Sequence, residues 1–326
     1  MRNLLVFLMA LCCITGCDKE KPVTPPPVVV PPVVTPVAVP APAPSKYMDP
    51  AKVLELFKKK SAESLVETLN DNAKVRLNQL VAKEEFLSKK LLAKVKARQA
   101  MKGKMMAQAF TGKGSVDLRD QSTEIVDQFG GTCTAHGLTA AIETTIGKPH
   151  QKLSERHVWS GYKQYSCDAA IERWSGTKSC VTLDSAWPHD NVHPYKGYLD
   201  SDNCYSFLVS TTSIDDDLQK MINALDIGHA VYLGIGVTKS LMNCDVALDP
   251  NSAAVSGGHA LDIVGYKLDA SVAGGGYFII KQSWGPDCGD HGYQYVPFNY
   301  CQRSDLYCVL WSIDEVTSVS SGMERK

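Results

Sequence analysis

The chain has 326 residues, a formal net charge of −1, 21% charged residues and 44% hydrophobic residues. This composition excludes a disordered or collagen-like chain, and the length suits one or two globular domains. The near-zero charge excludes a uniformly basic nucleic-acid-binding protein, and we expect no nucleic-acid partner. The eleven cysteines are an odd number, so each needs its own assignment.

Residues 1–16 have the pattern of a secretory signal peptide. Arg2 precedes an apolar run over residues 4–14, which is too short to span a bilayer but suits a signal-peptide core. The run ends in ITGC, and Cys17 then resembles the lipidated cysteine of a bacterial lipobox. An ordinary secretory signal is the alternative. The resemblance implies a lipid anchor at Cys17 in the bacterial cell envelope, facing the periplasm or the cell surface. The choice between inner and outer membrane stays open.

A proline-rich spacer follows the cysteine, over residues 17–46. Proline fixes φ and removes a backbone donor, so the Pro/Val/Ala-rich stretch 22–46 favours extended polyproline II. At about 3.1 Å per residue, such a spacer reaches about 75 Å from the membrane.

The neutral total conceals two oppositely charged segments. Residues 47–113 contain 15 Lys and Arg against 7 Asp and Glu. Residues 114–326 contain 15 basic and 26 acidic residues. A basic segment therefore precedes an acidic domain.

The basic segment 47–113 is predicted to be helical. Asp49 and Pro50 suit an N-cap and a first helical position, and apolar residues recur at helical spacing after them. A second helical stretch without proline is predicted over about 73–109. Three interpretations remain open: a solvated stalk, a regulatory prosegment folded across the acidic domain, and a basic amphipathic helix on anionic lipid.

Cys133 is the first candidate for chemistry. Gly130 and Gly131 permit a tight turn before it, and an apolar helical face follows it. A cysteine at a helix N-terminus is expected to have a lowered thiol pKa, which favours the nucleophilic thiolate. A buried structural cysteine is the alternative.

A second group of candidate residues lies far downstream. His259 opens an apolar strand, and Gln282 ends another strand predicted over 277–281. The order Cys, His, amide is the one expected of a nucleophilic triad.

These motifs together resemble papain-like (C1) cysteine peptidases. The resemblance covers about 115–315 and includes VDLRD before the cysteine, Cys133 followed by Ala135, GGHALDIVGY, and YFIIKQSWGPDCGDHGY. It implies an α+β, two-lobed fold, with the nucleophile helix in a helical lobe and His259 in a β-barrel-like lobe. The implied domain spans 114–318, followed by a tail over 319–326.

The resemblance also implies site roles and shows departures. Cys133, His259 and Gln282 would form the triad, Gln128 the oxyanion hole, and Trp284 a shield over the His259–Gln282 contact. Gln282 stands where the family usually has Asn, and Thr134 where it has Trp. Gln128 precedes the nucleophile by five residues instead of six.

The remaining cysteines suit disulfides in an oxidising compartment. Cys204 is expected to pair with Cys167 or Cys180, and one thiol besides Cys133 is expected to stay free. Two further bridges are expected among Cys244, Cys288, Cys301 and Cys308.

We expect no metal and no cofactor. His136 and His229 are interpreted as structural, and a zinc site at His291 with Cys288 and Cys301 is the lesser alternative because no CxxC pair supports it. Asp215, Asp216 and Asp217 are expected to acidify a helix start at 215–225 and not to bind calcium.

The predicted function is hydrolysis of peptide bonds by a membrane-anchored, monomeric thiol peptidase that acts through an acyl-enzyme on peptide or protein substrates. One alternative is a non-catalytic peptide-binding lipoprotein. The other is a related thiol acyltransferase or amidase.

Overall fold

The computed structural model describes residues 46–62, 68–102, 110–160, 166–185, 187–188 and 207–318. The predicted signal peptide, Cys17, the spacer and the tail 319–326 lie outside these residues. Within them, no helix combines the length and apolar character needed to cross a bilayer.

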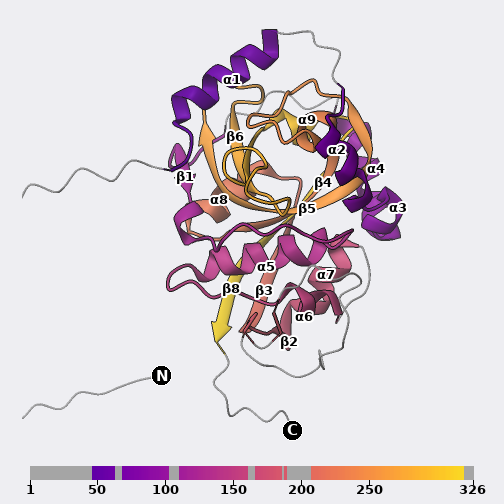
Figure 1. Cartoon of the computed structure of the whole chain (residues 1–326), viewed down its shortest axis with the longest axis vertical. Coiled ribbons are helices and arrows are strands. Elements are labelled where there is room, and N and C mark those ends of the chain that lie inside the picture. The colour runs from indigo at the N-terminus through magenta and orange to yellow at the C-terminus, as the bar shows by residue number, and fades with distance from the viewer. Residues whose placement is uncertain are drawn as a thin grey trace, which may run out of the picture. The chain divides into compact units, whose positions relative to one another are not determined.

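One curved antiparallel sheet forms the β-rich lobe (Figure 1). Its strand order is β2-β3-β8-β4-β5-β6-β7, with β1 added on β5. The strands span Ser115–Asp117 (β1), Gly176–Val181 (β2), Phe207–Asp215 (β3), Val231–Thr238 (β4), Ala254–Leu268 (β5), Gly276–Lys281 (β6), Tyr293–Pro297 (β7) and Cys308–Ser318 (β8). Every residue of β4 and β6 is buried, which explains why both read as continuous apolar runs rather than alternating ones.

The helical lobe is built around α5 (Cys133–Ile146), which lies between the sheet and the helices α6 (Glu155–Ser160) and α7 (Cys167–Trp174) (Figure 1). A methyl group on Gly137 would lie 2.7 Å from the backbone nitrogen of Leu261. The glycine therefore allows α5 to touch the backbone of β5 directly. Short helices complete the domain: α8 (Leu218–Asp226), α9 (Lys239–Met242), α10 (Asn299–Gln302) and the 3₁₀ turn η2 (Arg119–Gln121).

Two hydrophobic clusters fill the two lobes. One contains the inner side chains of β4 to β7, and the other contains the buried face of α5 with α6, α7 and the outer part of the sheet. The predicted two-lobed α+β fold is confirmed.

The basic segment folds as short helices, not as two long ones. They are α1 (Pro50–Ala62), α2 (Asp71–Arg76), η1 (Leu77–Gln79), α3 (Lys83–Phe86) and α4 (Lys89–Lys102). Asp49 accepts a hydrogen bond from the backbone of Ala51 at 2.7 Å, as expected near a helix start. The predicted continuous helix over 73–109 is wrong, because Val81 is extended and pairs with the sheet at Gly258. Residues 103–109 lie outside the described part.

The basic segment packs against the acidic domain along its described length. Val53 and Phe57 of α1 are buried, and the Phe57 ring lies 5.5 Å from that of Tyr277. Lys60 pairs with Asp245 at 2.7 Å. Arg98 of α4 pairs with Asp215 at 2.5 Å, so the opposite charges of the two segments meet directly.

Two disulfides confirm part of the cysteine prediction. Cys244 pairs with Cys288, and Cys301 pairs with Cys308. Cys167 is a free, buried thiol, so the option of a Cys204–Cys167 bridge is wrong: its side chain faces the apolar surroundings of Gly234 and Phe86. A bridge from Cys204 to Cys180 stays a prediction, since Cys204 and the Cys180 side chain lie outside the described part.

Candidate active site

Cys133 is the first residue of α5, as the sequence predicted. The loop before it turns at Gly130, whose φ of 57° suits glycine. The Cys133 side chain is fully buried. The backbone of Ala260 acts on the pKa of the Cys133 thiol, so the thiol lies against β5, beside the residue that follows His259.

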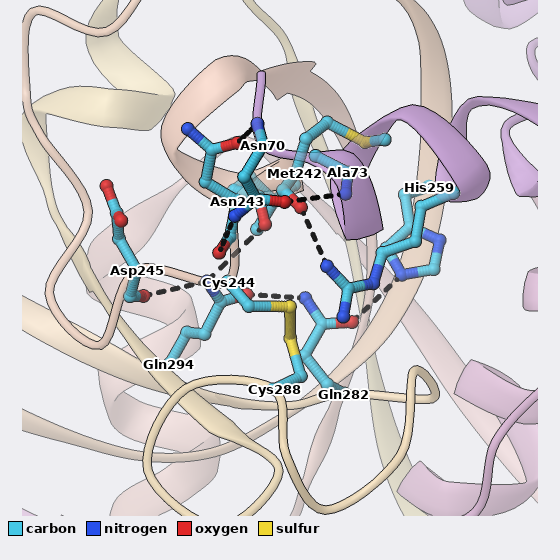
Figure 2. The surroundings of a disulfide bond; sticks show 12 residues. Asn70, Ala73, Met242, Asn243, Cys244, Asp245, His259, Gln282, Cys288 and Gln294 are labelled. Carbon is cyan, nitrogen blue, oxygen red and sulfur yellow. Dashed lines mark hydrogen bonds between the residues drawn. A yellow bond between two sulfur atoms is a disulfide. The ribbon is translucent and has the colours of Figure 1, made fainter. Parts of the chain in front are cut away.

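His259 and Gln282 meet as predicted. His259 lies in β5, and Gln282 directly follows the neighbouring strand β6. The Nε2 atom of His259 lies 3.1 Å from Oε1 of Gln282 (Figure 2). The Nδ1 atom is buried and has no hydrogen-bond partner among the described residues.

Trp284 covers this contact. Its ring stacks on the His259 ring with centroids 4.1 Å apart and planes 11° apart. Trp284 is itself almost fully buried. Trp284 thus lies against the His259 ring, and its role as a shield against water stays a prediction.

The pKa shifts of Cys133 and His259 both favour the neutral forms. Burial raises the pKa of the Cys133 thiol to about 12, although backbone hydrogen bonds from Ala260 and Thr134 oppose the shift. Burial lowers the pKa of His259 to about 3, and the bond to Gln282 opposes that shift. The lowered thiol pKa that we predicted is therefore wrong for this state, because complete burial outweighs the helix N-terminus.

Gln128 lies beside the nucleophile loop and is buried. Its Oε1 accepts a hydrogen bond from Ser283 Oγ at 2.6 Å, and its Nε2 donates to the Gly130 carbonyl at 2.7 Å. Its backbone nitrogen donates to the Ser283 carbonyl at 2.6 Å. Gln128 thus lies next to the segment that contains Gln282. Its side-chain NH₂ group, however, is hydrogen-bonded to the Gly130 carbonyl.

The basic segment lies over this region. Val81 and Gly258 exchange backbone hydrogen bonds of 3.3 and 2.8 Å, directly before His259. The side chain of Gln79 donates to the carbonyl of Gln128 at 3.1 Å. A surface pocket next to this crossing is lined by residues 78–82 on one side and by 128–131 on the other.

Two polar residues that the sequence analysis did not single out support the candidate triad. Ser283 holds Gln128, and Gln294 accepts a hydrogen bond from Nε2 of Gln282 at 2.7 Å. Gln294 is the second residue of the fully buried strand β7. The sequence signal that could have identified Gln294 is a single Gln in a short run of aromatic and aliphatic residues. Such a side chain is expected to be buried, and buried polar groups are usually hydrogen-bonded to a partner.

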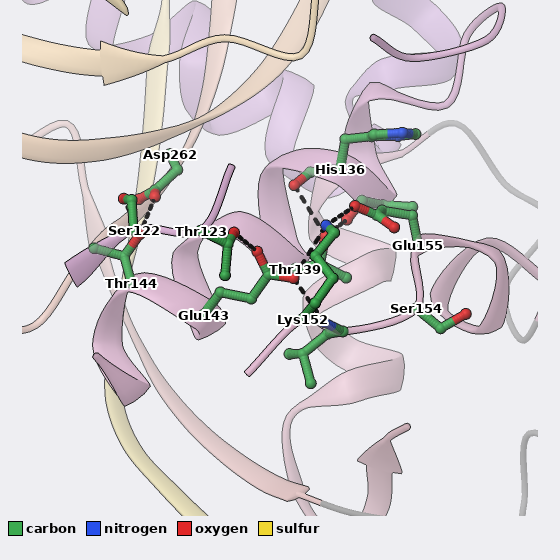
Figure 3. A network of polar contacts seen from close by, with 12 residues as sticks. Ser122, Thr123, His136, Thr139, Glu143, Thr144, Lys152, Ser154, Glu155 and Asp262 are labelled. Carbon is green, nitrogen blue, oxygen red and sulfur yellow. Dashed lines mark hydrogen bonds and ion pairs between the residues drawn. The ribbon is translucent and has the colours of Figure 1, made fainter. Parts of the chain in front are cut away.

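A buried network of charged side chains joins α5 to the segment 152–155 (Figure 3). Lys152 reaches both Glu143, at 3.2 Å, and Glu155, and Glu143 also accepts from the backbone of Leu153 at 2.7 Å. His136 is buried with Nδ1 3.0 Å from the Thr132 carbonyl, which fits its predicted packing role.

Near this network, Asp262 accepts a hydrogen bond from Thr144 at 2.7 Å, while its second oxygen is buried and has no hydrogen-bond partner among the described residues. Burial raises the pKa of Asp262 to about 7.

The cysteines of the alternative zinc site are engaged in disulfides, and the aspartates of the alternative calcium site in a helix cap and ion pairs. Cys288 and Cys301 are both in disulfides. Asp217 is the N-cap of α8, which begins at Leu218 and not at 215. Asp215 pairs with Arg98. In the part of the chain that the structure describes, no group of three metal-ligating side chains is found.

Comparison with known proteins identifies relatives. The family model for papain family cysteine protease matches residues 113–308. A peptidase C1-like protein of Acanthamoeba polyphaga mimivirus is 25% identical over 258 residues, covering 70% of this chain and 81% of that protein. Cathepsin B-like CP3 of Giardia intestinalis is 29% identical over 204 residues, covering 55% of this chain and 67% of that protein.

Solved structures share the fold. Xylellain, a cysteine protease from Xylella fastidiosa, matches with a TM-score of 0.53 at 19% identity, covering 78% of this chain and all of that one. The proform of the ragweed pollen cysteine protease Amb a 11 matches with a TM-score of 0.55 at 15% identity, covering 81% of this chain and 85% of that one.

Proposed function

Because this chain belongs to the papain family of cysteine proteases, we propose that it hydrolyses peptide bonds through Cys133, His259 and Gln282. Cys133 attacks the scissile carbonyl, and His259 takes the thiol proton and later gives it to the leaving amine. Gln282 orients the imidazole. The observation that supports this assignment is the 3.1 Å contact from Gln282 Oε1 to His259 Nε2, which leaves Nδ1 as the free base.

The reaction proceeds through an acyl-enzyme. Attack by sulfur forms a tetrahedral oxyanion, which collapses to a thioester as the amine leaves, and water then hydrolyses the thioester. The backbone N–H of Cys133 and the amide of Gln128 are the proposed oxyanion donors. Since Gln128 Nε2 donates to Gly130 in the closed state, this role requires that bond to be shared or released when substrate binds.

The basic segment is proposed to be an inhibitory prosegment. Its support is the Val81–Gly258 pairing, which places main chain across the region that a substrate backbone would occupy. Burial of Phe86 and the pairing of Arg98 with Asp215 also support it. A solvated stalk would leave Phe86 exposed, and a lipid-bound helix would direct Arg98 to phospholipid.

The lipobox-like sequence supports a further proposal, that Cys17 is lipidated and anchors the peptidase in the bacterial cell envelope. The spacer would hold the catalytic domain away from the bilayer, where it meets extended peptide or protein substrates. Metabolic labelling with palmitate tests the anchor: wild type should incorporate label, and Cys17→Ser should not. Equal incorporation would contradict it.

The central experiment measures active-site thiol reactivity. Full chain and chain treated to remove the basic segment by limited proteolysis are incubated with an epoxysuccinyl inhibitor. The treated wild type is expected to be labelled and to hydrolyse peptides, whereas Cys133→Ala and His259→Ala should do neither. Cys167→Ala is the matched control, since Cys167 is the other buried free thiol among the residues that the structure describes; it should behave as wild type.

The outcomes separate the alternatives. A treated wild type that binds peptides without being labelled would indicate the non-catalytic lipoprotein. Labelling with transfer to amines but no peptide hydrolysis would indicate an acyltransferase. Equal labelling before and after removal of the segment would contradict the inhibitory role.

A further inference from the structure

The carboxamide of Gln282 must present a particular end to His259. Oxygen and nitrogen of a carboxamide have nearly the same size, so either end fits the space sterically. With oxygen toward the ring, His259 carries its proton on Nε2 and leaves Nδ1 free. With nitrogen toward the ring, the proton moves to Nδ1, and the ring no longer offers a base on that side.

We propose that Gln294 is a positioning residue that fixes this orientation of Gln282 and thereby the tautomer of His259. The inference rests on the proposed role of His259 as proton acceptor. Gln294 is fully buried, and Gln282 is only 2% exposed, so solvent does not compete for their hydrogen bonds.

Main-chain carbonyls set the orientation of both carboxamides, because a carbonyl oxygen can only accept a hydrogen bond. Nε2 of Gln294 lies 2.8 Å from the carbonyl of Asp245 and 3.5 Å from that of Leu241. The NH₂ end of Gln294 must therefore face these carbonyls, and its oxygen must face Gln282. The bonded end of Gln282 is consequently Nε2, at 2.7 Å, which turns Oε1 toward His259 (Figure 2).

Rotating either carboxamide would break this chain of hydrogen bonds. A flipped Gln294 would set oxygen against the Asp245 carbonyl. A flipped Gln282 would set its NH₂ toward His259 and its oxygen toward the oxygen of Gln294. Each change leaves buried polar atoms unpaired, which is strongly unfavourable in a dry interior.

The accepting carbonyls belong to α9 (Leu241) and to the loop after it (Asp245), and this loop is itself held in place. The disulfide Cys244–Cys288 ties this loop to the turn after Gln282 (Figure 2). Ser240 Oγ donates to the Asp245 carboxylate at 2.6 Å. Gln282 is one methylene longer than the Asn usual at this position. Its hydrogen bond to Gln294 gives this longer side chain a second fixed contact besides His259.

The test uses the full chain with isotopically labelled histidine. NMR should show His259 of wild type as one Nε2–H tautomer. Gln294→Met, which has a similar length and no polar end, should show a mixture with the Nδ1–H form. Gln219→Met is the matched control, since Gln219 is a partly exposed glutamine of α8 bonded to Thr111; it should leave the His259 signals unchanged.

Peptide hydrolysis by the chain after nicking of the basic segment gives the second readout. Gln294→Met is expected to lower kcat about 10- to 100-fold with little change in KM, as expected for a mispositioned base. In a Gln282→Met background, the same substitution should change kcat by less than about 2-fold, because the two side chains act as one unit. If Gln294→Met does not fold, Gln294→Asn, one methylene shorter, replaces it.

Two results would overturn the inference while wild type is active. One is a single Nε2–H tautomer of His259 in the Gln294 variant. The other is a Gln294→Met substitution that lowers kcat by the same factor in the Gln282→Met background as in wild type. Failure of the proposed function is recognisably different. In that case wild type and Cys133→Ala hydrolyse peptide equally slowly, while the tautomer still reports on Gln294.

Discussion

Val81 and Gly258 exchange two backbone hydrogen bonds, so the basic segment is joined to β5 at the residue directly before His259. The pairing requires an extended backbone at Val81, which is why the predicted helix is interrupted there. It also requires a small residue opposite, because a methyl group on Gly258 would lie 2.4 Å from the Phe86 ring. The pairing thus lays main chain of the basic segment next to His259, whose side chain is fully buried, as is that of Cys133.

Phe86→Ala should release the basic segment. Phe86 is fully buried against Gly258, Gly234 and the ring of Tyr307. Replacing a buried phenylalanine by alanine typically costs about 3–5 kcal/mol of stability. Here the loss destabilises the state in which the basic segment is docked. We expect faster alkylation of Cys133 in the full chain. Val75→Ala serves as control, because Val75 is 68% exposed in the same segment; equal rates in the two variants would contradict the expectation.

The pH profile of Cys133 alkylation should shift when the segment is removed. In the docked state the thiol pKa is raised to about 12, so the thiolate is scarce at neutral pH and the rate should keep rising above about pH 9. Exposure removes the desolvation that causes the shift, so the rate should then become appreciable near neutral pH. The measurement is the alkylation rate from about pH 5 to 10, a range that brackets the ordinary thiol pKa, with Cys133→Ser as the blank. Superimposable profiles before and after cleavage count against burial as the cause.

Asp262→Asn should remove a pH-dependent loss of stability. The folded-state pKa of Asp262 is raised to about 7 from 3.8, so its protonated form is favoured by folding. Its contribution is complete below pH 3.8 and is lost as the pH rises through 7. Relative to the variant, wild type should lose up to about 4 kcal/mol of unfolding free energy across this window.

Urea unfolding between about pH 4 and 8, which covers that window, measures this difference. Asp120→Asn, at an exposed position, is the control and should follow wild type. A constant difference between wild type and Asp262→Asn across the range would show that the carboxyl does not titrate there.

The two disulfides should contribute unequally to stability. The Cys244–Cys288 bridge closes a loop of 44 residues, and the Cys301–Cys308 bridge closes one of 7. Loop-closure entropy predicts losses of about 4 and about 2 kcal/mol when each pair is replaced by serines. Denaturant unfolding of the two double variants tests the order; a larger loss for the shorter loop would be inconsistent with an entropic origin.

The sequence by itself determined the family-level features. The motifs around Cys133, His259 and Gln282 resemble those of papain-like peptidases, and that resemblance implied the two-lobed fold and the meeting of histidine and amide. The charge imbalance predicted two distinct segments. Motifs and charge are local in sequence, so they can be read without the structure.

Only the tertiary structure decided the state of the site. Cys133 is fully buried in one hydrophobic cluster with Val81 and Phe86, residues far from it in the chain. Burial reverses the predicted direction of the thiol pKa shift. The orientation of Gln282 depends on carbonyls of the loop at Leu241 and Asp245. Hydrogen-bond polarity and desolvation are set by what surrounds a group in space, and residue types in sequence order do not specify that environment.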